Sequence, residues 1–234
     1  MKRTLIVNAD DFGLSAGVNR GIIDCHEQGI VSSASLMVRG PSAPEAAEWS
    51  RETSRFSVGL HVDLAEWVFC DDEWRVAYEV VPLEDENAVK NEALRQLDLF
   101  RELTGKNPTH LDSHQHMHRD EPLHSILVKF SIDLSIPLRS YSDRIQYCGS
   151  FYGQSAKGGP YPEGIQLSHL LQVITDLPPG VTEMGCHPGL GNDVDSVYRF
   201  ERKEEVSILC DPAVRLALKE NQIELRSFFD FADC

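Results

Sequence analysis

Two short segments of this sequence combine residue types that bind metal ions and move protons. Asp10 and Asp11 directly follow the apolar run at residues 5–7, and residues 110–118 contain four histidines and an aspartate. Adjacent carboxylates repel one another unless a cation or a shared proton compensates them, and neutral imidazole is the commonest metal ligand in proteins. Together the segments indicate a metal site with a spare carboxylate beside it, which is the equipment of a metal-dependent hydrolase.

The histidine-rich segment is open to more than one arrangement. Its polar residues alternate, so on a strand they would share one face. A fully extended run would not direct all of them at one ion, so some must be ligands while the others support them or face solvent. The density of histidine argues against a merely solvated loop. The alternating residues are Asp112, His114, His116 and His118.

Single histidines also follow two other apolar runs. His61 ends one of them and His187 ends a later one. Taken alone, His61 reads as a satisfied core histidine and His187 as a loop histidine bonded to backbone. Both become site candidates because the ends of parallel strands meet on one face, where Asp11 and His114 also belong. One carboxylate and two imidazoles bind a divalent ion and leave positions open for water and substrate.

Short β-rich runs alternate with helical patterns along the rest of the chain. This alternation implies a mainly parallel sheet of the α/β class, and seven candidate strands suit a closed or nearly closed (β/α) barrel. No G-x-G-x-x-G follows the first strand, so a dinucleotide is not expected. The predicted strands cover residues 4–8, 34–38, 57–61, 109–112, 137–140, 182–186 and 223–227. The predicted helices, the first with Ser15 as its N-cap, cover residues 17–28, 44–53, 87–104, 121–134, 165–176 and 212–220.

Two segments resist assignment to this pattern. Residues 66–86 are acidic, include Trp67 and Trp74, and read as either a loop or an added hairpin. Residues 149–162 are rich in glycine and read as a long loop, a feature that is often functional in compact domains. Its aromatic residues could stack on sugar rings, cover the edge of the core or contact a second copy in a homodimer. They are Phe151, Tyr152 and Tyr161.

The composition narrows the class of protein. The 234 residues suit a single domain, residues 1–234, better than two. A net charge of -15, from 22 basic and 37 acidic residues, argues against nucleic acid and anionic membrane surfaces as partners. No stretch approaches the ~20 apolar residues of a membrane helix, and the first apolar run is too short for a signal peptide. The six scattered cysteines form no C-x-x-C pair, which predicts mostly reduced thiols in a cytoplasmic protein.

At these motifs the sequence resembles the YdjC-like carbohydrate deacetylases. Matching blocks run in the family's order over residues 3–190, and the combination is far more specific than any one block. The blocks are V-N-A-D-D-F-G-L-S at 7–15, G-I-V-S-S at 29–33, L-M-V at 36–38, V-G-L-H at 58–61, P-T-H-L-D-S-H-Q-H-M-H at 108–118, I-P-L-R at 136–139, F-Y-G at 151–153 and E-M-G-C-H-P-G at 183–189.

The resemblance implies a distorted TIM-like barrel that removes an acetyl group from an N-acetylated amino sugar or a short chitooligosaccharide. It implies one divalent ion, Mg2+ or Zn2+, bound by Asp11, His61 and His114. The segment between His61 and Asn87 is short and unusually acidic for the family. Because that segment would border the substrate cleft, the exact sugar is left open.

The resemblance also assigns the proton chemistry. Asp10 would be the general base, His187 the general acid, and Arg139 would orient Asp10 or the substrate. Supporting or substrate-contacting roles would fall to Asp112, His116, His118, Phe151 and Tyr152.

Two other functions use similar residues. A different barrel metallohydrolase, acting on phosphoesters or cyclic amides, would need comparable ligands, but the motifs lack a basic cluster for phosphate. A non-catalytic metal- or sugar-binding barrel would have no use for Asp10, a second carboxylate beside Asp11 that does not itself bind the metal. The sequence therefore favours the deacetylase over both alternatives.

Overall fold

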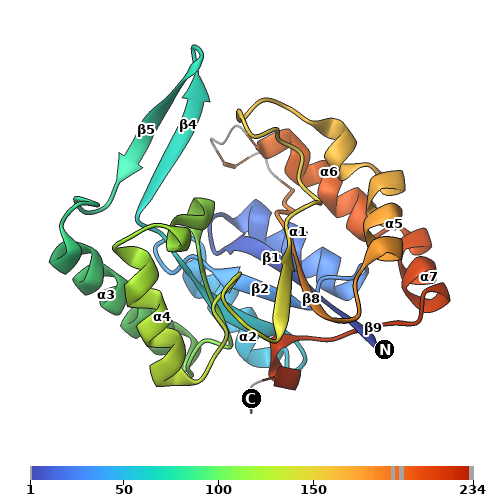
Figure 1. Ribbon diagram of the computed structural model, residues 1–234, viewed down its shortest axis with the longest axis horizontal. Helices are drawn as coiled ribbons and strands as arrows, with labels where there is room; N and C mark the ends of the chain where they lie inside the picture. The colour runs from blue at the N-terminus through green and yellow to red at the C-terminus, as the bar shows by residue number, and fades with distance from the viewer. Residues whose placement is uncertain (1, 191–192, 195–197, 232–234) are drawn as a thin grey trace.

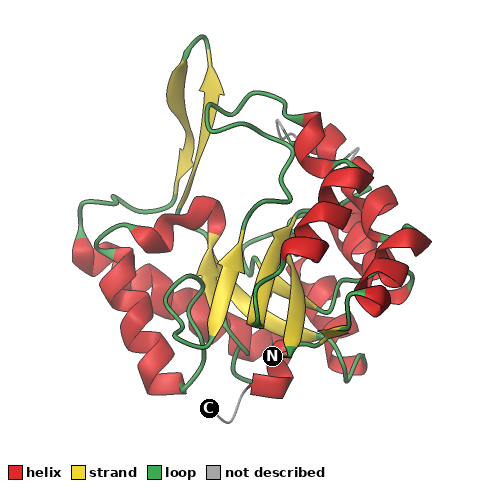
Figure 2. Cartoon of the chain, turned by 45° about the vertical axis from the view of Figure 1, so that its right-hand side comes forward, coloured by secondary structure: helices red, strands yellow, loops and turns green. Residues whose placement is uncertain are grey.

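A curled, mainly parallel β-sheet forms the centre of the molecule, and helices pack around its outside (Figure 1 and Figure 2). This computed structural model describes residues 2–190, 193–194 and 198–231. The strands lie in the order β6-β3-β2-β1-β8-β7, all paired in parallel, and β9 pairs with the start of β1. Their bounds are β1 Arg3–Phe12, β2 Ser33–Leu36, β3 Ser57–Val62, β6 Leu111–Ser113, β7 Ile145–Cys148, β8 Gly180–Cys186 and β9 Ile223–Leu225.

The sheet forms a half-barrel because, within the described residues, no strand ladder joins β6 to β7. The predicted distorted (β/α) barrel is confirmed in this form. Nine of the ten residues of β1 are buried, as expected for a parallel strand that is covered on both faces. Most buried apolar side chains belong to one large cluster, while Ile6, Ile145 and Phe228 form a smaller one.

Local sequence signals explain where the helices begin and end. Ser15 accepts a hydrogen bond from the Val18 amide at the start of α1, as predicted, and Asp85 caps α3 in the same way. Gly105 ends α3 with a left-handed φ of 73°. The helices are α1 Ala16–Glu27, α2 Ala43–Glu52, α3 Glu86–Thr104, α4 Leu123–Leu134, α5 Leu167–Asp176, α6 Arg199–Leu209 and α7 Pro212–Glu220. Among the described residues none of them is long and apolar enough to cross a membrane.

The strand predicted over residues 137–140 is wrong. That segment makes only one bridge to the sheet, between Leu138 and Leu111, and then turns at Ser140, whose φ is 68°. The strand in this part of the chain is β7, which pairs with β8. The helix α6 was not predicted at all.

The acidic segment at residues 66–86 contains a hairpin, which decides between the two alternatives left by the sequence. Its strands, β4 Ala65–Cys70 and β5 Glu73–Glu79, form a separate antiparallel ribbon that projects from the barrel (Figure 1). Asp71 and Asp72 both adopt left-handed φ values, 52° and 64°, as a two-residue hairpin turn requires. The loop predicted at 149–162 is mainly irregular, apart from one bridge between Gln154 and Pro160.

The cysteines in the described residues are free thiols, as predicted. Cys25 on α1 and Cys210 at the end of α6 lie closest together, with their sulfur atoms 3.8 Å apart. Cys234 lies outside the described residues.

Candidate active site

Asp10 and Asp11 both line one cavity, although neighbours on a regular strand point to opposite faces. The pairing of β1 with β2 shifts register between Ala9 and Phe12, and Asp11 has a left-handed φ of 66°. Such a bulge redirects side chains near the end of a strand. The local backbone therefore presents two consecutive carboxylates to the same space.

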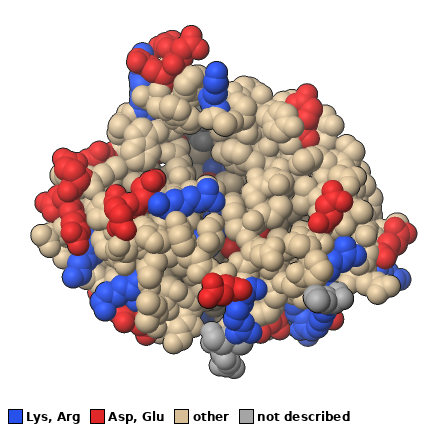
Figure 3. Space-filling model, in the orientation of Figure 1, with Lys and Arg blue, Asp and Glu red and all other residues tan. Residues whose placement is uncertain are grey.

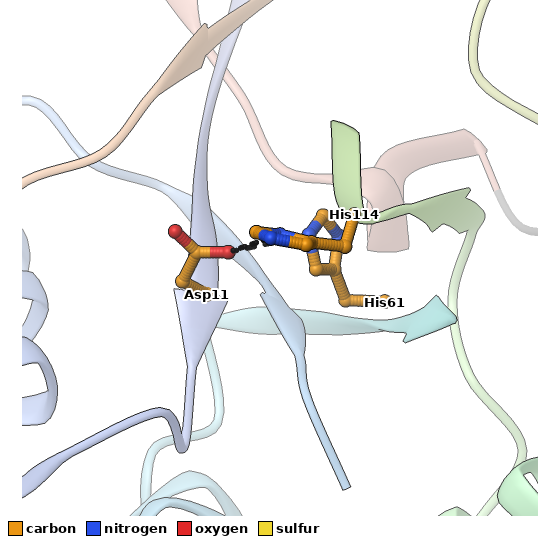
Figure 4. Close-up of side chains that lie close together, drawn as sticks. All are labelled: Asp11, His61 and His114. Atoms are coloured by element: carbon orange, nitrogen blue, oxygen red, sulfur yellow. Dashed lines mark hydrogen bonds and ion pairs between the residues drawn. The ribbon is translucent and has the colours of Figure 1, made fainter. Parts of the chain in front are cut away.

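Asp11, His61 and His114 bring three metal-binding atoms together at the ends of β1, β3 and β6 (Figure 4). The Asp11 Oδ1 atom lies 3.4 Å from His61 Nε2 and 3.2 Å from His114 Nδ1. Ligand atoms bonded to one ion at ~2.0–2.2 Å lie roughly 3–3.5 Å from one another. The spacing of these residues therefore fits a shared divalent ion.

Asp112 supports His61 from behind. Its Oδ1 atom lies 2.7 Å from His61 Nδ1, which leaves Nε2 directed at Asp11. A carboxylate in this position fixes the tautomer and orientation of a metal-binding imidazole. Burial alone would lower the pKa of His61, but the Asp112 charge and hydrogen bonds to Asp11 and Asp112 raise it to about 10. Without an ion, the His61 ring is therefore protonated on both nitrogens and positively charged at neutral pH.

The two oxygens of Asp11 have different partners. Oδ1 faces the two imidazoles, while Oδ2 lies 2.5 Å from the guanidinium of Arg202 on α6. Burial would raise the pKa of Asp11, but Arg202 and the two histidines hold it well below its usual value. Asp11 is therefore ionised and offers one oxygen to a cation.

Arg139 holds Asp10 in a fixed orientation. Its guanidinium donates to both Asp10 oxygens, at 2.6 and 2.7 Å, and also contacts Asp112 at 2.8 Å and Glu183 at 2.7 Å. Asp10, His61 and Asp112 form a second group with metal-binding spacing. A guanidinium already bonds to both carboxylates of that group, so the group with Asp11 and His114 suits an ion better.

His187 and Arg139 both lie near the Oδ2 atom of Asp10. The His187 Nε2 atom is 3.8 Å from Asp10 Oδ2. The His187 backbone amide donates to Glu205 at 2.5 Å, and its carbonyl accepts from Arg202 at 3.3 Å. Burial lowers the pKa of His187 to about 4, so the ring is neutral at pH 7.

A model of the family described as YdjC-like protein matches residues 4–220, which is most of the chain. The chain belongs to the YdjC-like family. A solved structure from Enterococcus faecalis V583, a protein proposed to cleave cellobiose phosphate, is similar to this YdjC-like chain, with 23% identity, a TM-score of 0.78 and coverage of 99% of both chains.

Two carbohydrate-active proteins are also similar in structure. A family 4 carbohydrate esterase from Streptomyces lividans, in complex with acetate, has 10% identity, a TM-score of 0.57 and coverage of 94% of this chain and 90% of its own. A polysaccharide deacetylase from Bacillus cereus has 13% identity, a TM-score of 0.56 and coverage of 97% and 92%. At these identities the similarity establishes a shared fold.

The three histidines His114, His116 and His118 do not share one face of a strand. The strand β6 ends at Ser113, and a 3-10 turn, His114–Arg119, follows. His116 lines the cavity with its Nε2 3.4 Å from the Tyr147 hydroxyl, and burial lowers its pKa to about 3. His118 is buried and bonds to the Ser113 hydroxyl at 2.8 Å. Only His114 of these three lies within metal-binding distance of Asp11.

The aromatic loop residues have separate positions. Phe151 is 1% exposed and packs in the hydrophobic core, and it also lines the cavity. Tyr152 lines the cavity, packs against the His187 ring at 5.2 Å and stacks on Tyr198 at 4.8 Å. Tyr161 is exposed.

Several buried groups at the site were missed in the sequence. On or just before α6, Arg202 binds Asp11, Glu205 binds the His187 amide, and Tyr198 donates to Glu205 at 2.6 Å. On β8, Glu183 binds Arg139. The only local signal is Arg202 and Glu205 at i and i+3 on one face of a helix, which resembles an ordinary surface ion pair.

Proposed function

We propose that this chain is a metal-dependent carbohydrate deacetylase that releases acetate from an N-acetylated amino sugar or its short oligomers. The observation that carries the proposal is the cluster of Asp11, His61 and His114 beside the Asp10 carboxylate, on the wall of a cavity of about 510 Å³. Membership of the YdjC-like family supports this class of activity. So does the fold shared with a carbohydrate esterase and a polysaccharide deacetylase.

Asp11, His61 and His114 would hold one divalent ion, Mg2+ or Zn2+. Two imidazole nitrogens and one carboxylate oxygen suit Zn2+ better than Mg2+, which prefers an all-oxygen shell. When bound, such an ion polarises a carbonyl oxygen and makes water more acidic.

Asp10 would accept the proton of the attacking water. Burial would raise its pKa, but Arg139 lowers it below the usual value, so the group is a carboxylate at neutral pH. Its Oδ1 atom receives hydrogen bonds from both Arg139 and Asn8, whereas Oδ2 receives one from Arg139. Oδ2 therefore keeps a free lone pair and is the atom that we assign as the proton acceptor.

His187 would protonate the departing amine. Because its ring is neutral at pH 7, it must first receive a proton, and Asp10 Oδ2 lies 3.8 Å from its Nε2. The proton from water would thus pass from Asp10 to His187 and on to the amine. Tyr152, packed against the ring, would hold it in place and restrict water.

The charge of the cavity supports an acetamide rather than a phosphoester as the reacting group. Among the described residues of its wall, Arg202 is the one Arg or Lys side chain, and it is already paired with Asp11. Asp10, Asp11 and Glu66 give the wall an acidic character. A neutral acetamide does not require a cationic partner, whereas a phosphoester does.

Acetate release tests the proposal directly. The purified protein is stripped with a chelator, reloaded with Mg2+ or Zn2+, and incubated with N-acetylglucosamine, its β-linked oligomers and their phosphorylated forms. We expect acetate and a free amine from at least one of them, only after a metal is restored. If none releases acetate while a phosphoester or cyclic amide is hydrolysed, the proposal is wrong.

A further inference from the structure

The β4–β5 ribbon carries three aromatic side chains that the fold does not use. Trp67, Phe69 and Trp74 lie outside the hydrophobic clusters of the described residues, and Trp74 is 53% exposed. An isolated two-stranded ribbon is marginally stable in water, and a cross-strand aromatic pair adds only a small stabilisation to it. Their presence therefore calls for an explanation other than core packing.

The three rings share one face of the ribbon. Trp67 and Phe69 are two residues apart on β4, and Trp74 on β5 pairs directly with Phe69. The Phe69 and Trp74 rings meet edge to face, with centroids 5.4 Å apart. All three side chains line the same cavity as Asp10 and Asp11. The ribbon thus presents an aromatic wall to the candidate active site.

Contacts at both ends fix this wall relative to the site. At the base, the Gln115 amide bonds to both backbone groups of Trp67, at 2.9 and 2.8 Å, and Gln115 directly follows His114. Toward the tip, Gly158 approaches so closely that an added Cβ would lie 2.9 Å from the Phe69 Cβ. The loop at 149–162 and the ribbon therefore meet over the cavity and enclose it together.

Glu66 at the base of β4 also lines the cavity, but the rest of the aromatic wall is free of charge on its cavity side. The charged residues Glu73 and Arg75 pair with Cys70 and Val68 across the ribbon, and they bond to each other at 2.7 Å. Figure 3 shows the hollow beneath the ribbon, with mostly uncharged side chains around it and one Lys or Arg side chain at its lower edge. Aromatic rings with few charges suit the apolar face of a sugar ring better than an anionic group.

We propose that Trp67, Phe69 and Trp74 form a subsite for a neutral sugar ring that is linked to the acetylated residue. The preferred substrate is therefore a neutral chain of at least two rings rather than a monosaccharide or a sugar phosphate. This inference rests on the proposed deacetylase function, because it takes the acetylated ring to lie at Asp10 and His187. The cavity of about 510 Å³ lies within the roughly 300–1,000 Å³ of ordinary ligand pockets.

Binding is measured by tryptophan fluorescence in metal-loaded Asp10→Asn protein, in which we expect turnover to be slowed by roughly 10²-fold or more. The chain has three tryptophans, and Trp49 packs against Phe12 and Phe56 in the core. We expect β-linked N-acetylglucosamine trimer to change the emission through Trp67 and Trp74, and N-acetylglucosamine to change it much less. The double variant Trp67→Phe, Trp74→Phe, which keeps Trp49, should show no change.

Trp74→Ala is the discriminating variant, and Val76→Ala is its control. Val76 is equally exposed, lies on the same face of the ribbon and does not line the cavity. In the active enzyme, Trp74→Ala should raise KM for the trimer about 10-fold, equivalent to ~1.4 kcal/mol, with kcat unchanged. Kinetics on the single sugar should not change, and Trp74→Phe should restore most of the binding. Val76→Ala should behave as wild type.

Three results would overturn the subsite: equal effects of Trp74→Ala on trimer and monomer, no effect on either, or tighter binding of a phosphorylated disaccharide that is insensitive to Trp74→Ala. Trp67→Ala gives a second test if Trp74→Ala alters the thermal unfolding. Failure of the proposed function would look different. Sugar chains would still bind with Trp74 sensitivity, but no acetate would be released.

Discussion

Raising the pH from 7 to 9 should tighten the binding of a divalent ion by a large and calculable factor. In the metal-free protein the pKa of His61 is about 10, because Asp112 and Asp11 outweigh the effect of burial. An imidazole must lose its proton to ligate an ion, so binding at neutral pH releases the proton of His61. Asp11 is already ionised and releases none.

The magnitude follows from the distance between the pKa and the pH. At pH 7 the difference of about three units costs ~4 kcal/mol at 1.36 kcal/mol per unit, which weakens apparent affinity about 10³-fold. Each unit of increase in pH recovers about tenfold until the pH approaches 10. The pKa of His114 is also raised, by its contacts with Asp11, and acts in the same direction. Affinity should therefore rise at least about 100-fold between pH 7 and pH 9.

Calorimetry in two buffers measures this proton directly. Chelator-treated protein is titrated with Zn2+ or Mg2+ at pH 7.5 in buffers of low and high ionisation enthalpy. We expect the difference between the two binding enthalpies to correspond to at least one proton released per ion bound. Asp112→Asn should lower the number of protons released per ion, because it removes the main charge that raises the pKa of His61. Equal enthalpies in both buffers, together with normal binding, would refute the assignment of His61 as a ligand.

Four further predictions concern the same site. His61→Ala and His114→Ala should each lose most bound metal and activity but keep the fold, as metal analysis and circular dichroism would show. Asp10→Asn should keep the metal and lose turnover by roughly 10²-fold or more, as for a lost general base, whereas Asp11→Asn should lose metal as well. His187→Ala should keep metal and substrate binding but lower kcat, and less so on an acetanilide with a good leaving group. Metal-free protein should lose stability from pH 7.5 to 9.5, whereas metal-loaded protein should not. The reason is that the raised pKa of His61 stabilises the folded state fully below pH 6.5, and this stabilisation is lost as the pH rises through about 10.

Controls separate these roles from general damage. His116→Ala should retain metal, and full metal in His61→Ala with loss in His116→Ala would exchange their assignments. Near-normal turnover in Asp10→Asn would refute the base. Glu183 and Glu205, whose pKa values burial raises to about 7, titrate mainly below the chosen window, so the difference between the metal-free and metal-loaded melts above pH 7.5 reports on His61 and His114.

The fold was predictable wherever the signal was local. Apolar runs at β1, β3 and β8 and the Ser15 cap of α1 appear as expected, because burial and capping act over a few residues. The segment at 137–140 was wrongly predicted as a strand. It does reach the sheet, but through one bridge to Leu111 and not through a full ladder. Six of the eleven residues of α6 are charged, which is typical of a solvated stretch, yet Arg202 and Glu205 are buried.

The candidate site was predictable in part for the same reason. Asp11, His61 and His114 follow strands that run in parallel, so their proximity follows from the topology. The contact between Arg202 and Asp11 joins residues 191 positions apart and depends on how α6 packs, which no local pattern reveals. The aromatic face of the ribbon likewise required the register of β4 and β5, because the printed sequence does not show that Phe69 and Trp74 are paired.

The central place of β1 has a consequence for how the chain is made. Its partner β2 follows soon after it, but β8 begins only at residue 180. At about 5–20 residues per second, a ribosome needs roughly 10–30 s to bridge that interval. During this time one edge of an apolar strand is open to pairing with other chains. Until Arg139 and later Arg202 are synthesised, Asp10 and Asp11 place uncompensated charges at the end of this strand, so the residues of the candidate site also discourage aggregation of the unfinished chain.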